Sequence, residues 1–182
     1  MSEIPVGILG ATGMVGQRFV QLLADHPWFK VTSVAASGTS AGQTYTESCH
    51  WLLSTPMPHA VRDLVVQGVD GALGCQLVFS ALPSHIAGPI EEELARAGLA
   101  VCTNASAHRL DPDVPLLIPE VNADHTALIE TQRRRRGGGG FIAASSNCSA
   151  TQLTVALKPL HDAFGLRLVS VVTMQALSGA GY

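Results

Sequence analysis

The chain has 182 residues, enough for one domain with a substantial buried core but too few for two large domains. Its 47% hydrophobic content and 18 glycines are typical of a buried α/β sheet. The net charge of -3 favours no nucleic acid partner, and no apolar run approaches the roughly 18 residues that a membrane span needs. The cysteines are widely spaced and lack zinc-binding patterns, which predicts a reduced cytoplasmic protein without a metal site.

Apolar stretches of strand length alternate with stretches of helical periodicity along the chain. The predicted strands span residues 4–9, 31–36, 76–82, 99–102, 141–144 and 166–177. The predicted helices span residues 13–26, 86–97, 124–132 and 148–164, with Pro159 expected to kink the last one or end it early. Residues 37–58 receive no assignment, and residues 106–119 are predicted to form a loop. The alternation predicts an α/β fold with a Rossmann-like, doubly wound, mostly parallel sheet.

A run of four arginines, Arg133–Arg136, is followed by four glycines, Gly137–Gly140. Like charges repel each other and glycines leave the backbone flexible, so the segment is predicted to be a solvated, mobile surface loop. An anion-binding role for the arginines is the alternative.

Gly10, Gly13 and Gly16 lie between the first predicted strand and the first predicted helix. In such a turn the first glycine permits the bend, the second lets the backbone approach a pyrophosphate, and the third lets the helix pack on the sheet. The pattern predicts dinucleotide binding at the helix N-terminus, and a compact turn without a ligand is the alternative. Ser37–Gly42 holds no acidic residue, and its hydroxyls favour the 2′-phosphate of NADP over NAD.

Cys148 lies at the start of a predicted helix, where the helix dipole and free N–H groups favour a thiolate. The same N–H groups could stabilise the oxyanion that forms when sulfur attacks a carbonyl. Asn147 either orients a substrate or caps the helix, and in the second case Cys148 has no special role. Arg109 follows a predicted strand, where its guanidinium could bind phosphate or carboxylate, with a surface ion pair as the alternative. The adjacent His108 is expected to be structural.

These segments together resemble aspartate-semialdehyde dehydrogenase, in the branch found in archaea and fungi. The matching segments occur in the same order over nearly the whole chain: Gly7–Gly16, Ser40–Gly42, Phe79–Pro83, Asn104–Arg109, Ile118–Asn122, Asn147–Ser149, Met174–Ala176 and Ser178–Gly181. The resemblance covers the first half of such an enzyme. It implies that residues 1–147 form an NAD(P)-binding domain, and that residues 148–182 begin a catalytic and dimerisation domain that is largely absent.

The resemblance implies NADP-dependent interconversion of aspartyl phosphate and aspartate semialdehyde through a thioester on Cys148. It places Asn147 and Gln175 beside this nucleophile, and it implies that Arg109 and Asn104 bind the substrate. The implied cofactor contacts are Gly10, Thr12, Gly13, Met14, Val15, Ser37, Ser40 and Gly179. A homo-oligomer with a small-molecule substrate is implied as well.

Departures from the family pattern leave other functions open. The family's histidine base, its second arginine and most of its dimer interface belong to the half that is not represented here. Thr39, Gln43 and Thr44 replace basic residues near the cofactor phosphate, so NAD binding, or loss of cofactor binding, is an alternative. Ser145–Ser146 replaces an Asn-Pro pair before the cysteine. The alternative functions are non-redox catalysis of cyclase or isomerase type, small-molecule binding in a specialised pathway, and a non-catalytic assembly module.

Overall fold

The computed structural model describes residues 3–69 and 73–176. Its strands are β1 (Ile4–Leu9), β2 (Phe29–Ala36), β3 (Val66–Gly68), β4 (Leu77–Ser80), β5 (Ala100–Thr103), β6 (Leu116–Leu117) and β7 (Phe141–Ser145). Its helices are α1 (Met14–Leu23), α2 (Tyr45–Ser48), α3 (His59–Arg62), α4 (Ser84–Arg96), α5 (Pro119–Asn122), η1 (Ala123–Ala127, a 3-10 helix), α6 (Leu128–Arg136) and α7 (Cys148–Phe164). No helix in the described ranges combines the length and apolarity that crossing a membrane requires.

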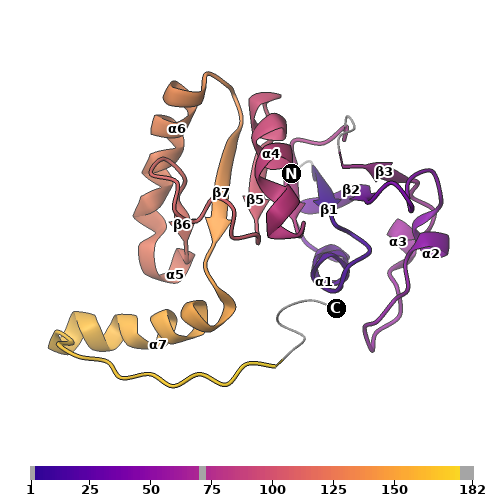
Figure 1. Ribbon diagram of the computed structural model, residues 1–182. Coiled ribbons are helices and arrows are strands. Elements are labelled where there is room, and N and C mark those ends of the chain that lie inside the picture. Colours follow the sequence, from indigo (N-terminus) through magenta and orange to yellow (C-terminus); the bar gives the residue numbers. More distant parts are fainter. Residues whose placement is uncertain (1–2, 70–72, 177–182) are drawn as a thin grey trace.

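The described strands form one seven-stranded sheet in the order β3-β2-β1-β4-β5-β7-β6, and all its pairings are parallel (Figure 1). This arrangement confirms the predicted Rossmann-like, doubly wound fold. The strand order reverses between β1 and β4, and in open parallel sheets ligands bind at such a switch point, outside the carboxyl ends of the strands. The turn that follows β1 therefore lies where a ligand is expected.

Two apolar clusters cover the two faces of the sheet. Neighbouring residues of a strand point to opposite faces, and Ile8 and Leu9 of β1 accordingly belong to different clusters. Ile8 shares its cluster with Val20 of α1, whereas Leu9 shares its cluster with Leu94 of α4. Because β1 is buried on both faces, its sequence is continuously apolar rather than alternating.

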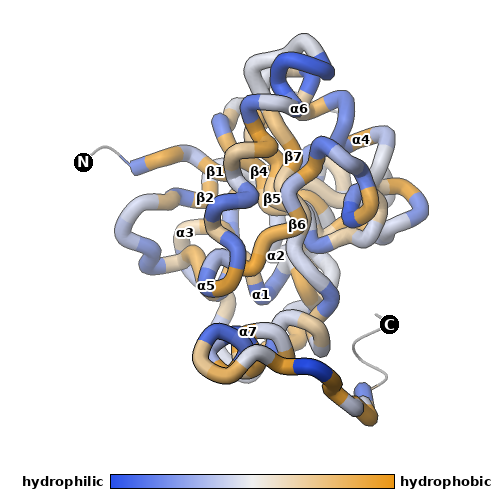
Figure 2. Tube along the Cα trace, turned by 90° about the vertical axis from the view of Figure 1, so that its left-hand side faces the viewer, coloured by the Kyte–Doolittle hydropathy of each residue, from blue (hydrophilic) through white to orange (hydrophobic). Residues whose placement is uncertain are grey.

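The arginine run does not form the predicted loop. Arg133–Arg136 make the last turn of α6, the hydrophilic stretch near the top of Figure 2, because arginine is a good helix former and its charges find acidic partners. Arg136 donates to both carboxylate oxygens of Asp113, at 2.8 and 3.1 Å, which offsets repulsion between neighbouring guanidiniums. Gly137 then ends the helix in the left-handed conformation, with φ 70°.

Two of the three glycines after Gly137 pack closely against the rest of the domain. A Cβ on Gly140 would lie 2.3 Å from the Leu99 carbonyl oxygen and 2.4 Å from the Ala95 carbonyl oxygen. At Gly138 the nearest atom would be 3.4 Å away, whereas nothing lies within 4 Å of a Cβ on Gly139. The segment is thus anchored against the connection from α4 to β5, contrary to the prediction of a mobile loop.

α7 lies beyond the carboxyl ends of the strands, apart from the two apolar clusters (Figures 1 and 2). It has no buried residue and contacts the rest of the domain mainly through α5. Pro159 does not end it early, because the helix continues to Phe164. The strand predicted at 166–177 is wrong over 166–176, and Leu177 lies outside the described residues. An apolar strand needs a partner for its N–H and C=O groups, and this segment pairs with none of the described strands.

Candidate active site

The turn between β1 and α1 has no room for a side chain at two of its glycines. Gly10 has a φ of +69°, and a Cβ there would lie 2.7 Å from the carbonyl oxygen of Ala81, which follows β4. A Cβ on Gly16 would lie 2.1 Å from the Gly10 carbonyl oxygen. Gly13 differs, because it is exposed and a Cβ there would have no neighbour nearer than 3.5 Å. Packing within the chain therefore does not demand glycine at position 13, which leaves room for a ligand.

The start of α1 is open. Its first turn has no side-chain cap and no acidic residue, so its backbone N–H groups and the positive end of its dipole can meet an anion. The predicted cofactor contacts Thr12, Met14 and Val15 flank this start and are at least partly accessible to solvent. The structure thus gathers these residues with Gly10 and Gly13 on a single turn, and their contact with a cofactor stays a prediction.

Two buried polar side chains, to which the sequence analysis assigned no role, fix this turn by hydrogen bonds to its carbonyl groups. Tyr45 donates its hydroxyl to the Ala11 carbonyl oxygen at 2.7 Å, and burial raises the pKa of Tyr45 far above its usual range, so the donor proton is retained. Gln17 donates to the carbonyl oxygens of Thr12 and His50, both at 2.9 Å. The turn's carbonyl groups are therefore held by the protein. The sequence feature that could have identified Gln17 is its position on the core-facing side of the predicted helix, where a polar side chain needs a hydrogen-bond partner.

The turn after β2 contains the predicted cofactor contacts Ser37 and Ser40. The Ser40 N–H donates to the Ser37 carbonyl oxygen at 2.9 Å, and Ser37 Oγ lies 3.0 Å from Thr39 Oγ1. Thr44 is committed elsewhere, because its N–H and its hydroxyl both donate to Glu47 in a capping box. Accessible hydroxyls rather than cations therefore characterise the place predicted to meet a 2′-phosphate.

Cys148 is exposed at the first position of α7, and Asn147 caps that helix. Asn147 Oδ1 accepts from the N–H groups of Ser149 and Ala150, at 3.1 and 3.3 Å, and from Ser149 Oγ at 2.6 Å. Of the two roles left open for Asn147, this geometry is that of the cap. Two of the N–H groups expected to bind an oxyanion are thus occupied, which leaves the N–H of Cys148 itself.

Gln175 lies beside the start of α7 although it is distant along the chain. Its Nε2 donates to Ser149 Oγ at 2.7 Å. The contact brings this predicted catalytic residue next to the residue that follows Cys148. Gly179, the last of the predicted cofactor contacts, lies outside the described residues.

Arg109 and Asn104 meet the segment that leads from β7 to Cys148. Arg109 Nε donates to the Ser145 carbonyl oxygen, and a terminal nitrogen donates to the Asn104 carbonyl oxygen, both at 3.0 Å. Ser145 Oγ donates to Asn104 Oδ1 at 2.7 Å. Within residues 3–69 and 73–176 Arg109 forms no ion pair, and its other N–H groups remain available to a phosphate or carboxylate.

The other cysteines are less suited to nucleophilic attack than Cys148. Burial raises the pKa of the Cys49 and Cys75 thiols, and it raises the pKa of Cys102 to about 11. A thiol must ionise to react, so these groups are largely unreactive at neutral pH. Cys148 is the exposed cysteine at a position where a ligand is expected.

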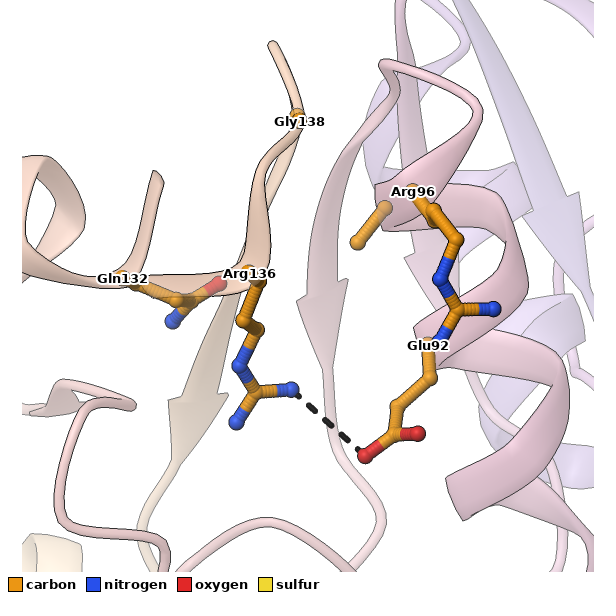
Figure 3. A pocket seen from close by; sticks show the side chains of 7 residues that line it. Glu92, Arg96, Gln132, Arg136 and Gly138 are labelled. Carbon is orange, nitrogen blue, oxygen red and sulfur yellow. Dashed lines mark ion pairs between the residues drawn. The ribbon is translucent and has the colours of Figure 1, made fainter. Parts of the chain in front are cut away.

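A small pocket of about 170 Å³ lies at the other end of β7, away from Cys148 (Figure 3). Its lining residues are Glu92, Ala95, Arg96, Gln132, Arg136, Gly138 and Gly140. Gly140 precedes β7 and Cys148 follows it, so the pocket and the thiol are on opposite edges of the sheet. Arg136 and Glu92 point toward one another across the pocket, with 3.6 Å between Nη1 and Oε1. The pocket is therefore separate from the candidate site.

Two proteins of known activity are similar to nearly the whole chain. The aspartate-semialdehyde dehydrogenase of Archaeoglobus fulgidus is 52% identical over 178 residues, which are 97% of this chain and 52% of that enzyme. The malonyl CoA reductase (NADP) of Metallosphaera sedula is 42% identical over 181 residues, which are 98% of this chain and 50% of that enzyme. The chain thus spans about half the length of the curated relatives it matches.

Structural comparison agrees with the sequence comparison. The crystal structure of aspartate semialdehyde dehydrogenase with NADP from Candida albicans has a TM-score of 0.83 at 42% identity, over 91% of this chain and 48% of that one. Residues 5–129, more than half of the chain, match the family described as "Semialdehyde dehydrogenase, NAD binding domain". The open helix start, the accessible cysteine and these matches lead to one conclusion: the chain belongs to the semialdehyde dehydrogenase family and contains its NAD-binding domain.

Proposed function

We propose that this chain supplies the NADP-binding site and the nucleophilic cysteine of an aspartate-semialdehyde dehydrogenase. The observation that carries the proposal is the grouping of Cys148, Arg109 and Asn104 at the carboxyl ends of β5 and β7. The open start of α1 lies at the same edge of the sheet. The archaeal and fungal relatives with this name support the choice of substrate, at 52% and 42% identity.

The proposed reaction begins when the Cys148 thiolate attacks the aldehyde carbon of aspartate semialdehyde. A C–S bond forms and the carbonyl oxygen becomes an oxyanion, which the Cys148 N–H is placed to stabilise. NADP, when bound, supplies the hydride acceptor that allows this adduct to become a thioester. A phosphate held by Arg109 then attacks the thioester carbon. The new C–O bond replaces the C–S bond, whose electron pair returns to Cys148 as thiolate.

The residues at the start of α1 suit the cofactor proposed here. The uncapped first turn and the free space beside Gly13 would receive the pyrophosphate, with contacts from Gly10, Thr12 and Met14 or Val15. Ser37 and Ser40 would hold the 2′-phosphate through their hydroxyls. We place the boundary between the cofactor domain and the start of the catalytic domain at 147/148, because α7 buries no residue against the sheet.

The isolated chain is expected to be a slow enzyme. The resemblance assigns the histidine base and a second arginine to the half of the relatives that this chain does not span. Loss of a general base lowers a rate by roughly 10² to 10⁴, so we expect turnover in that range below a complete enzyme. The free cysteines agree with the cytoplasmic location that we propose.

We also propose that the chain self-associates through α7 and the segment after it. Eight large apolar side chains there are 40% to 98% exposed: Val155, Leu160, Phe164, Leu168, Val169, Val171, Val172 and Met174. Exposed apolar surface of this extent is typical of an interface. Sedimentation velocity over a concentration series should show an oligomer, and a monomer at every concentration would contradict self-association.

The proposed function is tested by following NADPH absorbance with the purified chain, aspartate semialdehyde, phosphate and NADP. Formation of NADPH that disappears in Cys148→Ala is the expected result, with NADPH binding measured separately by fluorescence. A parallel reaction contains malonyl-CoA and NADPH, because one relative is a malonyl CoA reductase. NADPH consumption in that reaction alone would move the substrate to an acyl-CoA. A folded chain that binds no NADPH would contradict the proposal and favour the non-redox or assembly alternatives.

A further inference from the structure

Glu91 of α4 is a buried carboxylate beneath the carboxyl ends of β4 and β5. Its exposed fraction is 0%, and its Oε1 accepts from Ser80 Oγ at 2.5 Å and from Thr103 Oγ1 at 2.7 Å. These hydroxyls belong to the last residues of β4 and β5. Glu91 therefore links the two strands where their ligand-binding connections begin. A carboxylate buried so completely is very unfavourable unless its second oxygen also finds a donor.

His108 faces that second oxygen. His108 Nε2 lies 3.6 Å from Glu91 Oε2, and both atoms are buried with no hydrogen-bond partner among the described residues. The other ring nitrogen, Nδ1, lies 2.8 Å from Asp111 Oδ2. The imidazole thus stands between two carboxylates, and each of its ring nitrogens faces a carboxylate oxygen.

Arg136 of α6 pairs with the other two carboxylates near His108, those of Asp111 and Glu92. Its guanidinium lies 3.3 Å from Asp111 and 3.6 Å from Glu92. Glu92, His108 and Asp111 are near enough to one another to hold a metal ion, but Arg136 already supplies a cation between the two carboxylates. Arg136 forms no ion pair with Glu91 in the described part of the chain, so His108 is the basic side chain that faces Glu91.

Glu91 and His108 together fix both ends of the loop that carries Arg109. Thr103, which donates to Glu91, directly precedes Asn104 and also accepts a backbone N–H of the loop at 3.0 Å. His108 directly precedes Arg109. Thr103 on one side of this short loop is therefore hydrogen-bonded to Glu91, and His108 on the other side faces the same carboxylate at 3.6 Å.

We propose that Glu91 and His108 form a buried pair that positions the Arg109 guanidinium toward the anion that reacts at Cys148. This inference rests on the proposed function, because it assumes that Arg109 holds the substrate's phosphate or carboxylate. Glu91 and His108 are positioning residues, which act through the loop and touch no substrate. Without the pair Arg109 is still present, but the hydrogen bonds from its side chain to the Ser145 and Asn104 carbonyl oxygens become weaker. Its positive charge then spends less time near the thiol.

The test compares alkylation of Cys148 by anionic iodoacetate and by neutral iodoacetamide, on the full 182-residue chain. A cation held near the thiolate accelerates the anionic reagent selectively, so the ratio of the two rate constants reports the placement of Arg109. Mass spectrometry follows each cysteine-containing peptide separately. Labelling of the buried Cys49 reports unfolding in the same sample. A merely structural role would change both rate constants together and leave their ratio unaltered.

We expect Arg109→Ala to lower the iodoacetate-to-iodoacetamide ratio roughly tenfold, and Glu91→Gln and His108→Gln to lower it at least roughly threefold. The iodoacetamide rate constant should fall less than the iodoacetate rate constant, because the neutral reagent is not attracted by the guanidinium. Glu93→Gln, at an exposed position of the same helix, is the matched control and should keep the wild-type ratio. In an Arg109→Ala background, Glu91→Gln should cause no further fall, since no guanidinium remains to be positioned.

A wild-type ratio in both Glu91→Gln and His108→Gln, with a lowered ratio in Arg109→Ala, would overturn the positioning role and leave the proposed function intact. A wild-type ratio in Arg109→Ala would remove the anion site on which both proposals rest. If Glu91→Gln exposes Cys49 by unfolding, the ratio in His108→Gln decides between these outcomes.

Discussion

α1 and α7 both begin at the ligand-binding edge of the sheet, and their first turns are completed in opposite ways. α1 begins after Gly13 with no side-chain cap, whereas the Asn147 side chain accepts two backbone N–H groups of α7. The turn before α1 is instead fixed by hydrogen bonds that Tyr45 and Gln17 donate to its carbonyl oxygens. A helix start can thus stay free for a ligand only where other residues fix its position.

The capped start of α7 has fewer donors to offer. The sequence predicted that several N–H groups could stabilise an oxyanion at Cys148, but those of Ser149 and Ala150 are bonded to Asn147. What remains is the Cys148 N–H, with Gln175 and Arg109 nearby through their bonds to Ser149 and Ser145. In our proposal, side chains would therefore supply part of the anion stabilisation at Cys148, whereas at α1 the backbone N–H groups would supply it to the cofactor phosphate.

Gly16→Ala should have the largest effect, because it disrupts the packing of α1 against the turn that precedes it. The new Cβ would lie 2.1 Å from the Gly10 carbonyl oxygen, so α1 must move away from β1. We expect the free energy of unfolding to fall by roughly 1–3 kcal/mol and NADPH binding to be lost. Urea denaturation and NADPH fluorescence measure the two effects. Gly139→Ala is the control, since nothing lies within 4 Å of its Cβ, and equal stability of the two variants would contradict the tight turn.

Neither of the compared helix starts has an acidic residue in its first turn, so neither should contribute a carboxylate to the pH dependence of stability. A pH effect should arise at the end of α6, where hydrogen bonds from Arg136 hold the pKa of Asp113 below its usual range. A lowered folded-state pKa stabilises the protein above the unfolded pKa of about 4, and this contribution is lost as the pH falls through the folded pKa.

Asp113→Asn should therefore lower the free energy of unfolding by about 1–2 kcal/mol at pH 7, and the difference from wild type should shrink below about pH 4. Urea denaturation at pH 7, 5 and 3 measures it. Asp63→Asn, at an exposed position, should show little difference at any pH. A difference for Asp113→Asn that stays constant down to pH 3 would rule out the charge of Asp113 as its cause.

Asn147→Ala removes the cap and makes the start of α7 resemble that of α1. We expect a loss of about 1 kcal/mol that is confined to α7, because this helix buries no residue against the sheet. Amide hydrogen exchange at Ser149 and Ala150 should become faster, while exchange in β1 should not change. Asn147→Asp retains an acceptor and should restore slow exchange. Unchanged exchange at both amides in Asn147→Ala would show that the cap has no energetic role.

Gly13→Ser makes the opposite change and gives α1 a cap. Serine is a better N-cap than glycine by a few tenths of a kcal/mol, so a small gain in stability is expected. NADPH affinity should fall roughly tenfold, since the new hydroxyl competes for an N–H group that the phosphate needs. Thermal denaturation and NADPH titration measure the two effects. A gain in both quantities would mean that the start of α1 does not bind the pyrophosphate.

Local patterns in the sequence predicted those parts of the fold that depend on neighbours in the chain. The strand, glycine turn and helix from residue 4 onward lie within a few residues of their predicted bounds, and α7 has its predicted outer bounds, although Pro159 does not end it early. Residues 166–177 show the limit. Their apolar composition suits a strand, but a strand exists only beside a partner, and periodicity carries no information about partners.

The candidate site likewise contains residues that local sequence patterns identify and residues whose roles depend on distant partners. Gly10 was identified from the glycine pattern between a strand and a helix, Cys148 from its position at a helix start, and Arg109 from its position after a strand. The topology brings all three to one edge of the sheet. Tyr45 and Glu91 were missed, because the role of a buried polar residue depends on partners that are distant in sequence or set by packing.

The closely packed glycine after α6 also determines how two strands align. Gly140 leaves no room for a Cβ beside the Leu99 carbonyl oxygen, and the residues that follow Leu99 and Gly140, Ala100 and Phe141, are paired in register. A larger residue at position 140 would part the two connections and shift β7 along β5. Because the strands are rigid, the same shift would reach Ser145 at the far end, where it binds Arg109. A contact at the amino edge of the sheet would thus affect the spacing between Arg109, the arginine that we propose to bind an anion, and the end of β7 that leads to the cysteine.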